Sequence, residues 1–251
     1  MTPDDTDSLL DGADSLDANA ILTNEEVDAL LSAIHEGDIV VGKSGDAKEH
    51  RIRPYDFRQV SRLSRVDKQR LQYIHESAAV NIGAAMSMYL RCIVECRLIA
   101  LEEISYRNFA DSITSNVHVV VMNIKPMEGN GLILLDMDLV LNVIDKSLGG
   151  PGVYSSSEGA LTEVEATIIN TIIRDVIIFE GLAVSWKENA EINWSIERTE
   201  ADMRVVQIAR DDALMMSANF AIDGDLGLGR MIECLPFSSI EEFVAGFSGE
   251  A

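Results

Sequence analysis

Residues 23–35 alternate polar and apolar positions with the period of a short amphipathic helix. Thr23 and Glu26 have the spacing of a capping box, which satisfies the first backbone N–H groups of a helix. One apolar stripe at helical spacing consists of Val27, Leu30, Leu31 and Ile34, and Leu22 before the cap pairs with Val27 as a hydrophobic staple. A helix of about twelve residues is marginal by itself in water. The stripe therefore predicts docking, either on the chain's own domain or on a partner.

Two longer helices are predicted over residues 64–90 and 162–186, because apolar residues recur there at helical spacing. Each begins with a capping pattern, Ser64 with Asp67 and Thr162 with Glu165. The second stripe is wider than the first, so the second helix is expected to be deeply buried. These two helices divide the chain into two similar halves.

Segments typical of strands follow each long helix. In the first half they cover residues 92–104, 116–125 and 130–136, with a helical turn expected in "NFADSI" between the first two. In the second half they cover residues 191–199, 203–209 and one long strand near 214–222 or 228–235. A short helix closes each half, at about 138–147 and 238–246. The pattern predicts an α/β domain with internal pseudo-two-fold symmetry, in which each repeat is long helix, three strands and short helix.

The charges of the chain are unevenly distributed. The net charge is -22, yet residues 1–42 contain no Lys or Arg, and the basic residues then concentrate between positions 43 and 70. Such boundaries often mark domain edges. The predicted organisation, in order, is a disordered acidic leader at 1–21, a docking helix at 22–36, a linker at 37–52, a folded domain at 53–247 and a tail at 248–251. The basic run at 51–70 is a solvated helix start with an arm, or a surface that holds the acidic leader or a neighbouring subunit.

Charge and hydropathy exclude two classes of partner. Strong acidity argues against binding nucleic acid through its phosphates and favours partners with basic surfaces. The N-terminus lacks the pattern of a signal peptide. The most apolar long stretch, residues 161–186, is interrupted by five charged residues, so direct membrane insertion is not expected. We expect a cytoplasmic protein that can sit against something membrane-bound.

Few residues carry a pattern typical of chemistry. None of the four histidines has a carboxylate or Cys at metal-ligand spacing, and no Ser lies in a nucleophile elbow, so no metal, cofactor or catalytic residue is expected. The segment "GGPG" at 149–152 lacks the Lys of a phosphate loop. It fits a helix C-cap and turn. It equally fits a rigid backbone knuckle that another protein can approach closely.

Four segments resemble the family of the bacterial flagellar motor switch protein FliM. They occur in the family's order: "LTNEEVDALL" (22–31), residues 55–91, "DKSLGGPG" (145–152) and "CLPFSSIEEF" (234–243). The resemblance implies a CheC-like pseudo-symmetric domain in a flagellar switch subunit. Such a subunit captures phosphorylated CheY and transmits the signal to FliG, which changes the direction of rotation in chemotaxis. It packs against neighbouring FliM copies in the cytoplasmic C-ring, peripheral at the inner membrane in the flagellar basal body.

The resemblance also assigns site residues. Those expected to bind CheY are Leu22, Glu26, Val27, Leu30, Leu31 and Ile34. Those expected to bind FliG are Gly149, Gly150, Pro151 and Gly152. The family continues into a FliN-like domain, whereas this sequence stops at Ala251, so contact with FliN is doubtful and a truncated assembly or decoy paralogue is an alternative.

CheC-type phosphatases offer a second alternative. Their sites pair a Glu with an Asn three residues later on each long helix. Here Glu76 is followed at that spacing by Ala79, and Glu165 by Ile168. The resemblance therefore implies a protein that is not an enzyme.

Overall fold

The computed structural model describes residues 63–113, 116–153, 161–189 and 191–247. The predicted leader, docking helix and linker lie outside these ranges, as do the start of the folded domain and the tail. All six residues expected to bind CheY therefore lie outside the described residues.

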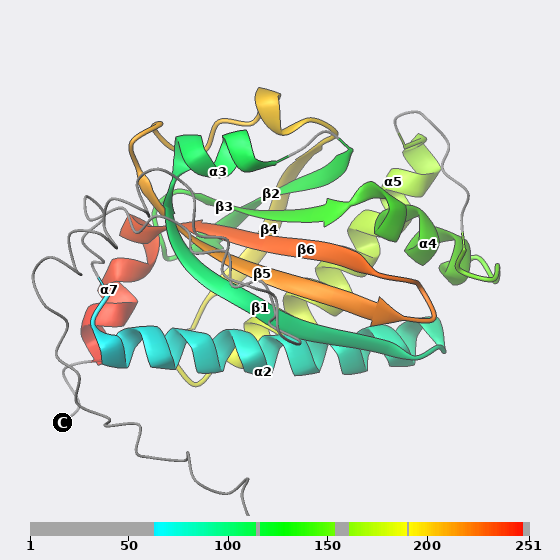
Figure 1. Ribbon diagram of the computed structural model, residues 1–251, viewed down its shortest axis with the longest axis horizontal. Helices are drawn as coiled ribbons and strands as arrows, with labels where there is room; N and C mark the ends of the chain where they lie inside the picture. The colour runs from blue at the N-terminus through cyan, green and yellow to red at the C-terminus, as the bar shows by residue number, and fades with distance from the viewer. Residues whose placement is uncertain (1–62, 114–115, 154–160, 190, 248–251) are drawn as a thin grey trace, which may run out of the picture. The chain divides into compact units, whose positions relative to one another are not determined.

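The described chain forms two successive halves of similar order (Figure 1). The first contains α2 (Arg65–Leu90), β1 (Val94–Ser105), α3 (Tyr106–Ser112), β2 (Val117–Lys125), β3 (Asn130–Asp136) and α4 (Met137–Ser147). The second contains the continuous α5 (Glu163–Ile172), η1 (Ile173–Ala183) and α6 (Val184–Trp186), followed by β4 (Asn193–Glu200), η2 (Met203–Val205), β5 (Leu214–Gly224), β6 (Gly229–Pro236) and α7 (Phe237–Phe247). The predicted long helices, short helices and helical turn are all present.

The caps read from the sequence are formed. The side chain of Ser64 accepts a hydrogen bond from the backbone N–H of Asp67 at the start of α2. Thr162 and Glu165 make a reciprocal capping box at the start of α5. These caps satisfy N–H groups that lack partners within a helix, which is why both long helices begin where the sequence predicts.

The six strands form one antiparallel sheet in the order β1-β5-β6-β3-β2-β4. Strands β1, β2 and β3 of the first half correspond to β4, β5 and β6 of the second half. When each strand is replaced by its counterpart, the same strand order is obtained in reverse, as a two-fold axis requires. The two halves meet at the centre, where β3 pairs with β6 and Ile133 lies opposite Glu233. The predicted pseudo-two-fold architecture is confirmed.

Two strand predictions in the second half were wrong in detail. Residues 203–209 contain the short 3-10 helix η2 and irregular chain instead of a strand, because Met203 and Val206 are buried at a spacing of three. Segments near 214–222 and 228–235 are both strands, β5 and β6, where one long strand was expected. The left-handed backbone at Gly224 and Gly227 turns the chain between them.

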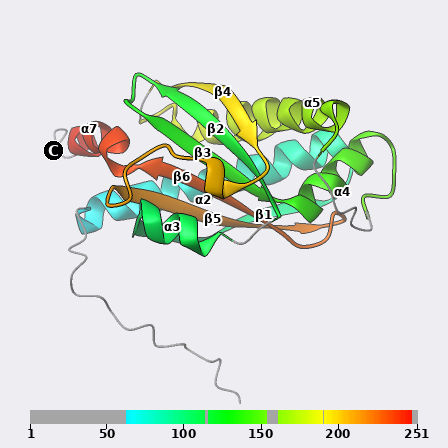
Figure 2. The same ribbon diagram turned by 90° about the horizontal axis from the view of Figure 1, so that it is seen from above.

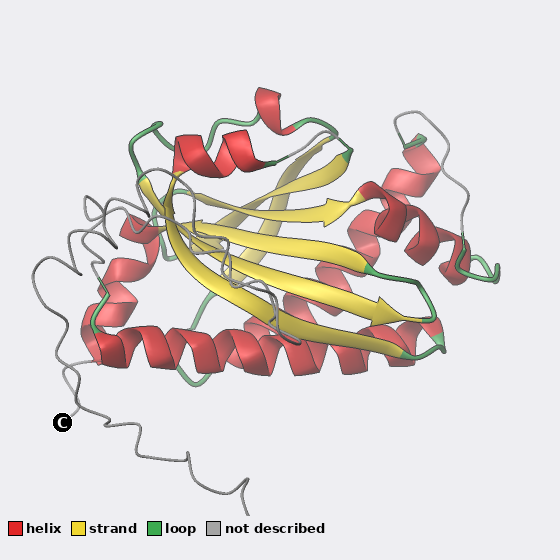
Figure 3. Ribbon diagram, in the orientation of Figure 1, coloured by secondary structure: helices red, strands yellow, loops and turns green. Residues whose placement is uncertain are grey.

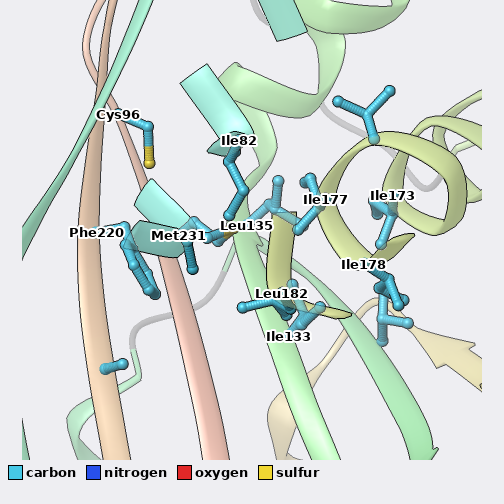
Figure 4. Packing of buried hydrophobic residues seen from close by; sticks show 14 of the residues in the cluster. Ile82, Cys96, Ile133, Leu135, Ile173, Ile177, Ile178, Leu182, Phe220 and Met231 are labelled. Atoms are coloured by element: carbon cyan, nitrogen blue, oxygen red, sulfur yellow. The ribbon is translucent and has the colours of Figure 1, made fainter. Parts of the chain in front are cut away.

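The two long helices cover one face of the sheet, and α3 lies on the other (Figures 2 and 3). Successive side chains of a strand point to opposite faces of the sheet, so both faces are apolar. Ile133 and Leu135 lie in the main core beneath the long helices. Leu132 and Leu134 lie in a second cluster with Tyr106 of α3. Figure 4 shows Ile82 of α2 meeting side chains of η1 and the central strands. The helices approach closely because Gly181 has no Cβ, which would collide with Ile82.

One polar pair lies inside the main core. His75 Nε2 on α2 and a carboxylate oxygen of Glu233 on β6 are 3.1 Å apart, and neither side chain is exposed. His75 Nδ1 donates to the backbone carbonyl of Leu71 at 2.6 Å, and Trp186 packs against the ring edge to face. The pair ties a long helix to the strand at the pseudo-two-fold axis.

None of the helices in the described part of the chain combines the length and apolarity that crossing a membrane requires.

Candidate protein-binding site

The segment "GGPG" begins as the C-cap of α4. The N–H of Gly150 donates to the carbonyl of Asp145 at 2.8 Å, and the N–H of Gly149 donates to the carbonyl of Lys146 at 3.0 Å. Gly149 is left-handed with φ +91°. This is the Schellman arrangement, in which one left-handed residue satisfies the last carbonyls of a helix. The C-cap reading is therefore confirmed, but it accounts for only the first glycine.

The carboxylate of Asp145 holds the remainder of the loop. Its Oδ2 accepts a hydrogen bond from the N–H of Gly152 at 2.8 Å. A Cβ on Gly150 would collide with the same carboxylate, so a side chain there would have to displace it from its hydrogen bond to Gly152. Gly152 is buried and left-handed, and its Cα faces Leu226 of the β5–β6 turn. The loop is thus folded back onto the end of α4 and fixed in shape.

The outer side of this loop is open. Among the described residues other than its two chain neighbours, none has an atom within 4 Å of the position of a Cβ on Gly149, and Pro151 is exposed. Leu148 and Val153 flank the glycines with 69% and 73% of their surface exposed. We call residues 148–153 the knuckle. The knuckle thus exposes apolar side chains beside bare backbone at Gly149, and an exposed apolar patch is typical of a surface that another protein covers.

A pocket of about 470 Å³ adjoins the knuckle. Its lining comes from the end of α2 and from the end of α4: Tyr89, Leu90, Arg91, Lys146, Ser147, Gly149 and Gly150. Figure 1 shows both helix ends at the same end of the domain. Two of these residues are basic in an acidic protein, so the pocket favours a partner that brings a carboxylate next to its apolar contact.

Leu228, in the β5–β6 turn, is 79% exposed, while Leu226 of the same turn packs on Gly152. This turn therefore extends the apolar surface beside the knuckle. Sequence reasoning found the glycines and missed Asp145, Tyr89, Arg91 and Leu228.

The carboxylates that a CheC-type phosphatase site would use are engaged elsewhere. Glu165 accepts hydrogen bonds from the backbone N–H and the hydroxyl of Thr162, both at 2.8 Å, and these lower its pKa. Glu76 accepts from the side-chain amide of Gln72 at 2.9 Å. Neither has an amide side chain three residues later on the helix.

The two asparagines on these helices also have structural partners. Asn81 donates to the hydroxyl of Ser185 at 3.1 Å, joining the long helices, and Asn170 lies 3.2 Å from Nε2 of His118. Within the described ranges, no three His, Cys, Asp or Glu side chains gather closely enough to hold a metal ion. The arrangement on the long helices supports packing rather than proton transfer.

Comparison with known proteins gives one family. Residues 64–250 match the sequence profile of the family described as "Flagellar motor switch protein FliM". The flagellar motor switch protein FliM of Escherichia coli (strain K12) is 28% identical over 228 residues, which cover 89% of this chain and 67% of that protein. The chain spans about two thirds of the length of such relatives.

Solved structures agree with the fold. The FliM middle domain from H. pylori is 26% identical with a TM-score of 0.65, and the match covers 73% of this chain and 99% of that one. FliM in a FliG–FliM complex from H. pylori is 27% identical with a TM-score of 0.69, and the match covers 73% of this chain and 100% of that one.

Proposed function

Because the chain belongs to the FliM family of flagellar motor switch proteins, we propose that it captures phosphorylated CheY on residues 22–34 and passes the signal to FliG through Gly149, Gly150, Pro151 and Gly152. The signal changes the direction of flagellar rotation in chemotaxis.

The knuckle is the observation that carries the FliG assignment. Its backbone is exposed at Gly149, and its shape is fixed from inside by Asp145. A loop that is ordered before binding loses less conformational entropy when the partner arrives. The absence of side chains at the glycines lets the partner's backbone approach closely. The solved FliG–FliM complex from H. pylori supports FliG as the partner, because its FliM shares the fold at 27% identity.

Capture of CheY and switching are separate events. A helix on a tether binds the regulator and raises its local concentration beside the domain, so that a second, weaker contact becomes intramolecular. The bound regulator shifts the domain between two arrangements only by its difference in affinity for them. Switching therefore requires a CheY contact with the folded domain in addition to the contact with residues 22–34.

The chain acts as a binding protein and not as a phosphatase. Glu165 is part of a capping box, Glu76 is held by Gln72, and the residues three positions later are Ile168 and Ala79. A carboxylate that already accepts its hydrogen bonds within a helix cap is poorly placed to position a water at a phosphoryl group. The domain packs against neighbouring copies in the cytoplasmic ring, peripheral at the inner membrane.

The experiment that tests the FliG assignment is a calorimetric titration of FliG with the full chain and with a variant that blocks the open side of Gly149. Loss of affinity in that variant supports the site.

A further inference from the structure

Two cations line the pocket beside the knuckle without a carboxylate opposite them. Arg91 and Lys146 both belong to the pocket, and its lining contains no Asp or Glu. Within the described ranges neither side chain forms an ion pair. Other cations of the domain do, such as Arg230 with Asp136 at 3.2 Å. In a chain with a net charge of -22, the pocket is therefore a local positive site.

Both side chains are held in place at the ends of helices. Arg91 is the C-cap of α2, with a left-handed backbone at φ 53° and its N–H donating to the carbonyl of Ser87. The stem of Lys146 lies along the knuckle, since a Cβ on Gly152 would be 3.4 Å from Cδ of Lys146. A long side chain whose stem is already packed loses less conformational entropy when its charged head binds.

A structural role at the helix ends accounts for only part of this charge. The C-terminus of a helix carries about half a negative charge, which a nearby cation offsets. Arg91 and Lys146 lie at the ends of α2 and α4 and bring one full positive charge each. Each helix end thus leaves about half of a positive charge uncompensated at the pocket.

The acidic groups of this region are turned to the backbone. Asp145 Oδ2 accepts a hydrogen bond from the N–H of Gly152, and Asp225 Oδ2 accepts one from the N–H of Ile93, both at 2.8 Å. Neither carboxylate lines the pocket. A partner at the pocket therefore meets the charged heads of Arg91 and Lys146.

The pocket and the knuckle form one continuous surface, because Gly149 and Gly150 belong to both. A partner that covers the open side of the knuckle is thus brought to the pocket as well. The planar guanidinium of an arginine and the ammonium of a lysine both bind carboxylates. Tyr89, which is 51% exposed, adds a hydroxyl that can donate a hydrogen bond. The group that fits this set of donors is the carboxylate of an Asp or Glu side chain.

We propose that Arg91 and Lys146 bind an acidic side chain of FliG and that this second contact sets the orientation of FliG on the knuckle. Bare backbone at Gly149 can be approached from several directions, so the knuckle alone leaves FliG free to pivot. A charge contact on one side of the knuckle removes that freedom, and complementary charges favour one register over others. The inference rests on the proposed function and adds the chemistry by which FliG is recognised and oriented.

Zero-length cross-linking tests the contact. A water-soluble carbodiimide activates a carboxylate, and the amine of Lys146 displaces the activating group to form an amide, while the carbodiimide leaves as a urea. No spacer is introduced, so only groups in direct contact are joined. We expect the full chain mixed with FliG to yield peptides that join Lys146 to an Asp or Glu of FliG. Lys187, exposed at the end of α6, is the internal control and should yield none. A mixture that binds without forming the Lys146 cross-link would overturn the proposal.

Calorimetric titration tests the energy of the contact. The double variant Arg91→Gln with Lys146→Gln should weaken FliG binding about tenfold in low salt and less than about twofold in roughly 0.5 M salt, because salt screens charge contacts. Arg107→Gln with Lys187→Gln is the matched control, since it removes the same two charges at exposed positions on α3 and at the end of α6. Equal losses in the two double variants, or a loss that salt does not change, would overturn the proposal.

The variant Gly149→Leu separates this inference from the proposed function. If Gly149→Leu weakens FliG binding and the double variant at Arg91 and Lys146 does not, the knuckle binds FliG without the acidic contact and only this inference fails. If neither change alters the affinity, the assignment of the FliG site itself fails.

Discussion

The carboxylate of Asp145 and the backbone N–H of Gly152 are joined by a hydrogen bond of 2.8 Å across the base of the knuckle. The two positions are seven apart in the sequence, and the loop that this bond closes contains the residues assigned to FliG. The carboxylate also occupies the space that a side chain at Gly150 would need. One acidic side chain on α4 therefore closes the loop and, in this position, fills the space beside Gly150.

The variant Asp145→Asn should weaken FliG binding while the domain remains folded. A hydrogen bond to a charged acceptor contributes about 1 kcal/mol more than a neutral one, so we expect roughly a fivefold loss of affinity. Calorimetric titration measures it, and amide exchange at Gly152 should become faster. Asp111→Asn is the matched control, because Asp111 is exposed on α3. Equal losses in both variants would show that net charge, not loop closure, sets the affinity.

The buried pair of His75 and Glu233 should make stability depend on pH. Burial by itself lowers the pKa of His75, but the hydrogen bond and charge of Glu233, with the Leu71 carbonyl, outweigh it and raise that pKa above its usual 6.5. The folded state then binds this proton more tightly than the unfolded chain. The stabilisation is complete below about pH 6.5 and is lost as pH rises through the folded pKa.

The reference for this effect is the double variant His75→Leu with Glu233→Leu, because an apolar pair often replaces a buried ion pair without loss. Urea unfolding between pH 6 and pH 9 should show the free energy of unfolding of the unmodified chain falling relative to the variant, by at most about 1.4 kcal/mol per pH unit. If the free energies of unfolding of the unmodified chain and the double variant change equally with pH, the raised pKa of His75 is contradicted. The single variant Glu233→Gln should lose about 3–5 kcal/mol, since it leaves the buried histidine without its charged partner.

The double variant Leu30→Asp with Leu31→Asp should lose at least tenfold in affinity for phosphorylated CheY, because two charges would enter an apolar contact. The circular dichroism spectrum and the melting temperature should not change. Ser32→Asp is the control, because position 32 faces away from Leu30 and Leu31 on the predicted helix. Unchanged binding in the double variant would remove residues 22–34 from the site.

The chain should not accelerate dephosphorylation of CheY. Phosphate release from phosphorylated CheY, measured with and without an excess of the full chain, should proceed at the same rate. A tenfold acceleration would contradict the structural roles found for Glu76 and Glu165 and would favour a phosphatase.

Local signals in the sequence were sufficient for most of the fold. The capping box of Thr162 and Glu165 predicts the start of a helix from hydrogen bonds between residues three apart. Strands β2 and β3 are short apolar runs bounded by turns. Residues 203–209 misled because Met203 and Val206 are apolar for a tertiary reason, burial in the second cluster. Buried residues on one face of a strand are two positions apart, whereas Met203 and Val206 are three apart and lie at a 3-10 turn.

The site was only half visible in the sequence. The glycines of the knuckle are recognisable in the sequence as a cluster. The hydrogen bond from the N–H of Gly152 to Asp145 and the proximity of Leu228, which is far along the chain, are not. Such contacts depend on how the two halves pack, and no local pattern encodes them.

The measurement that tests the central claim most directly is the titration of FliG with Gly149→Leu. Apart from its two chain neighbours, the described residues have no atom within 4 Å of the new Cβ, so the side chain would project from the knuckle. Gly129→Leu is the matched control, because Gly129 has φ +93° in the exposed β2–β3 turn and carries similar backbone strain. We predict that Gly149→Leu raises the Kd for FliG at least tenfold, about 1.4 kcal/mol, whereas Gly129→Leu stays within twofold of the unmodified chain. A Gly149→Leu chain that binds FliG as tightly as the unmodified chain would contradict the assignment of the knuckle as the FliG site.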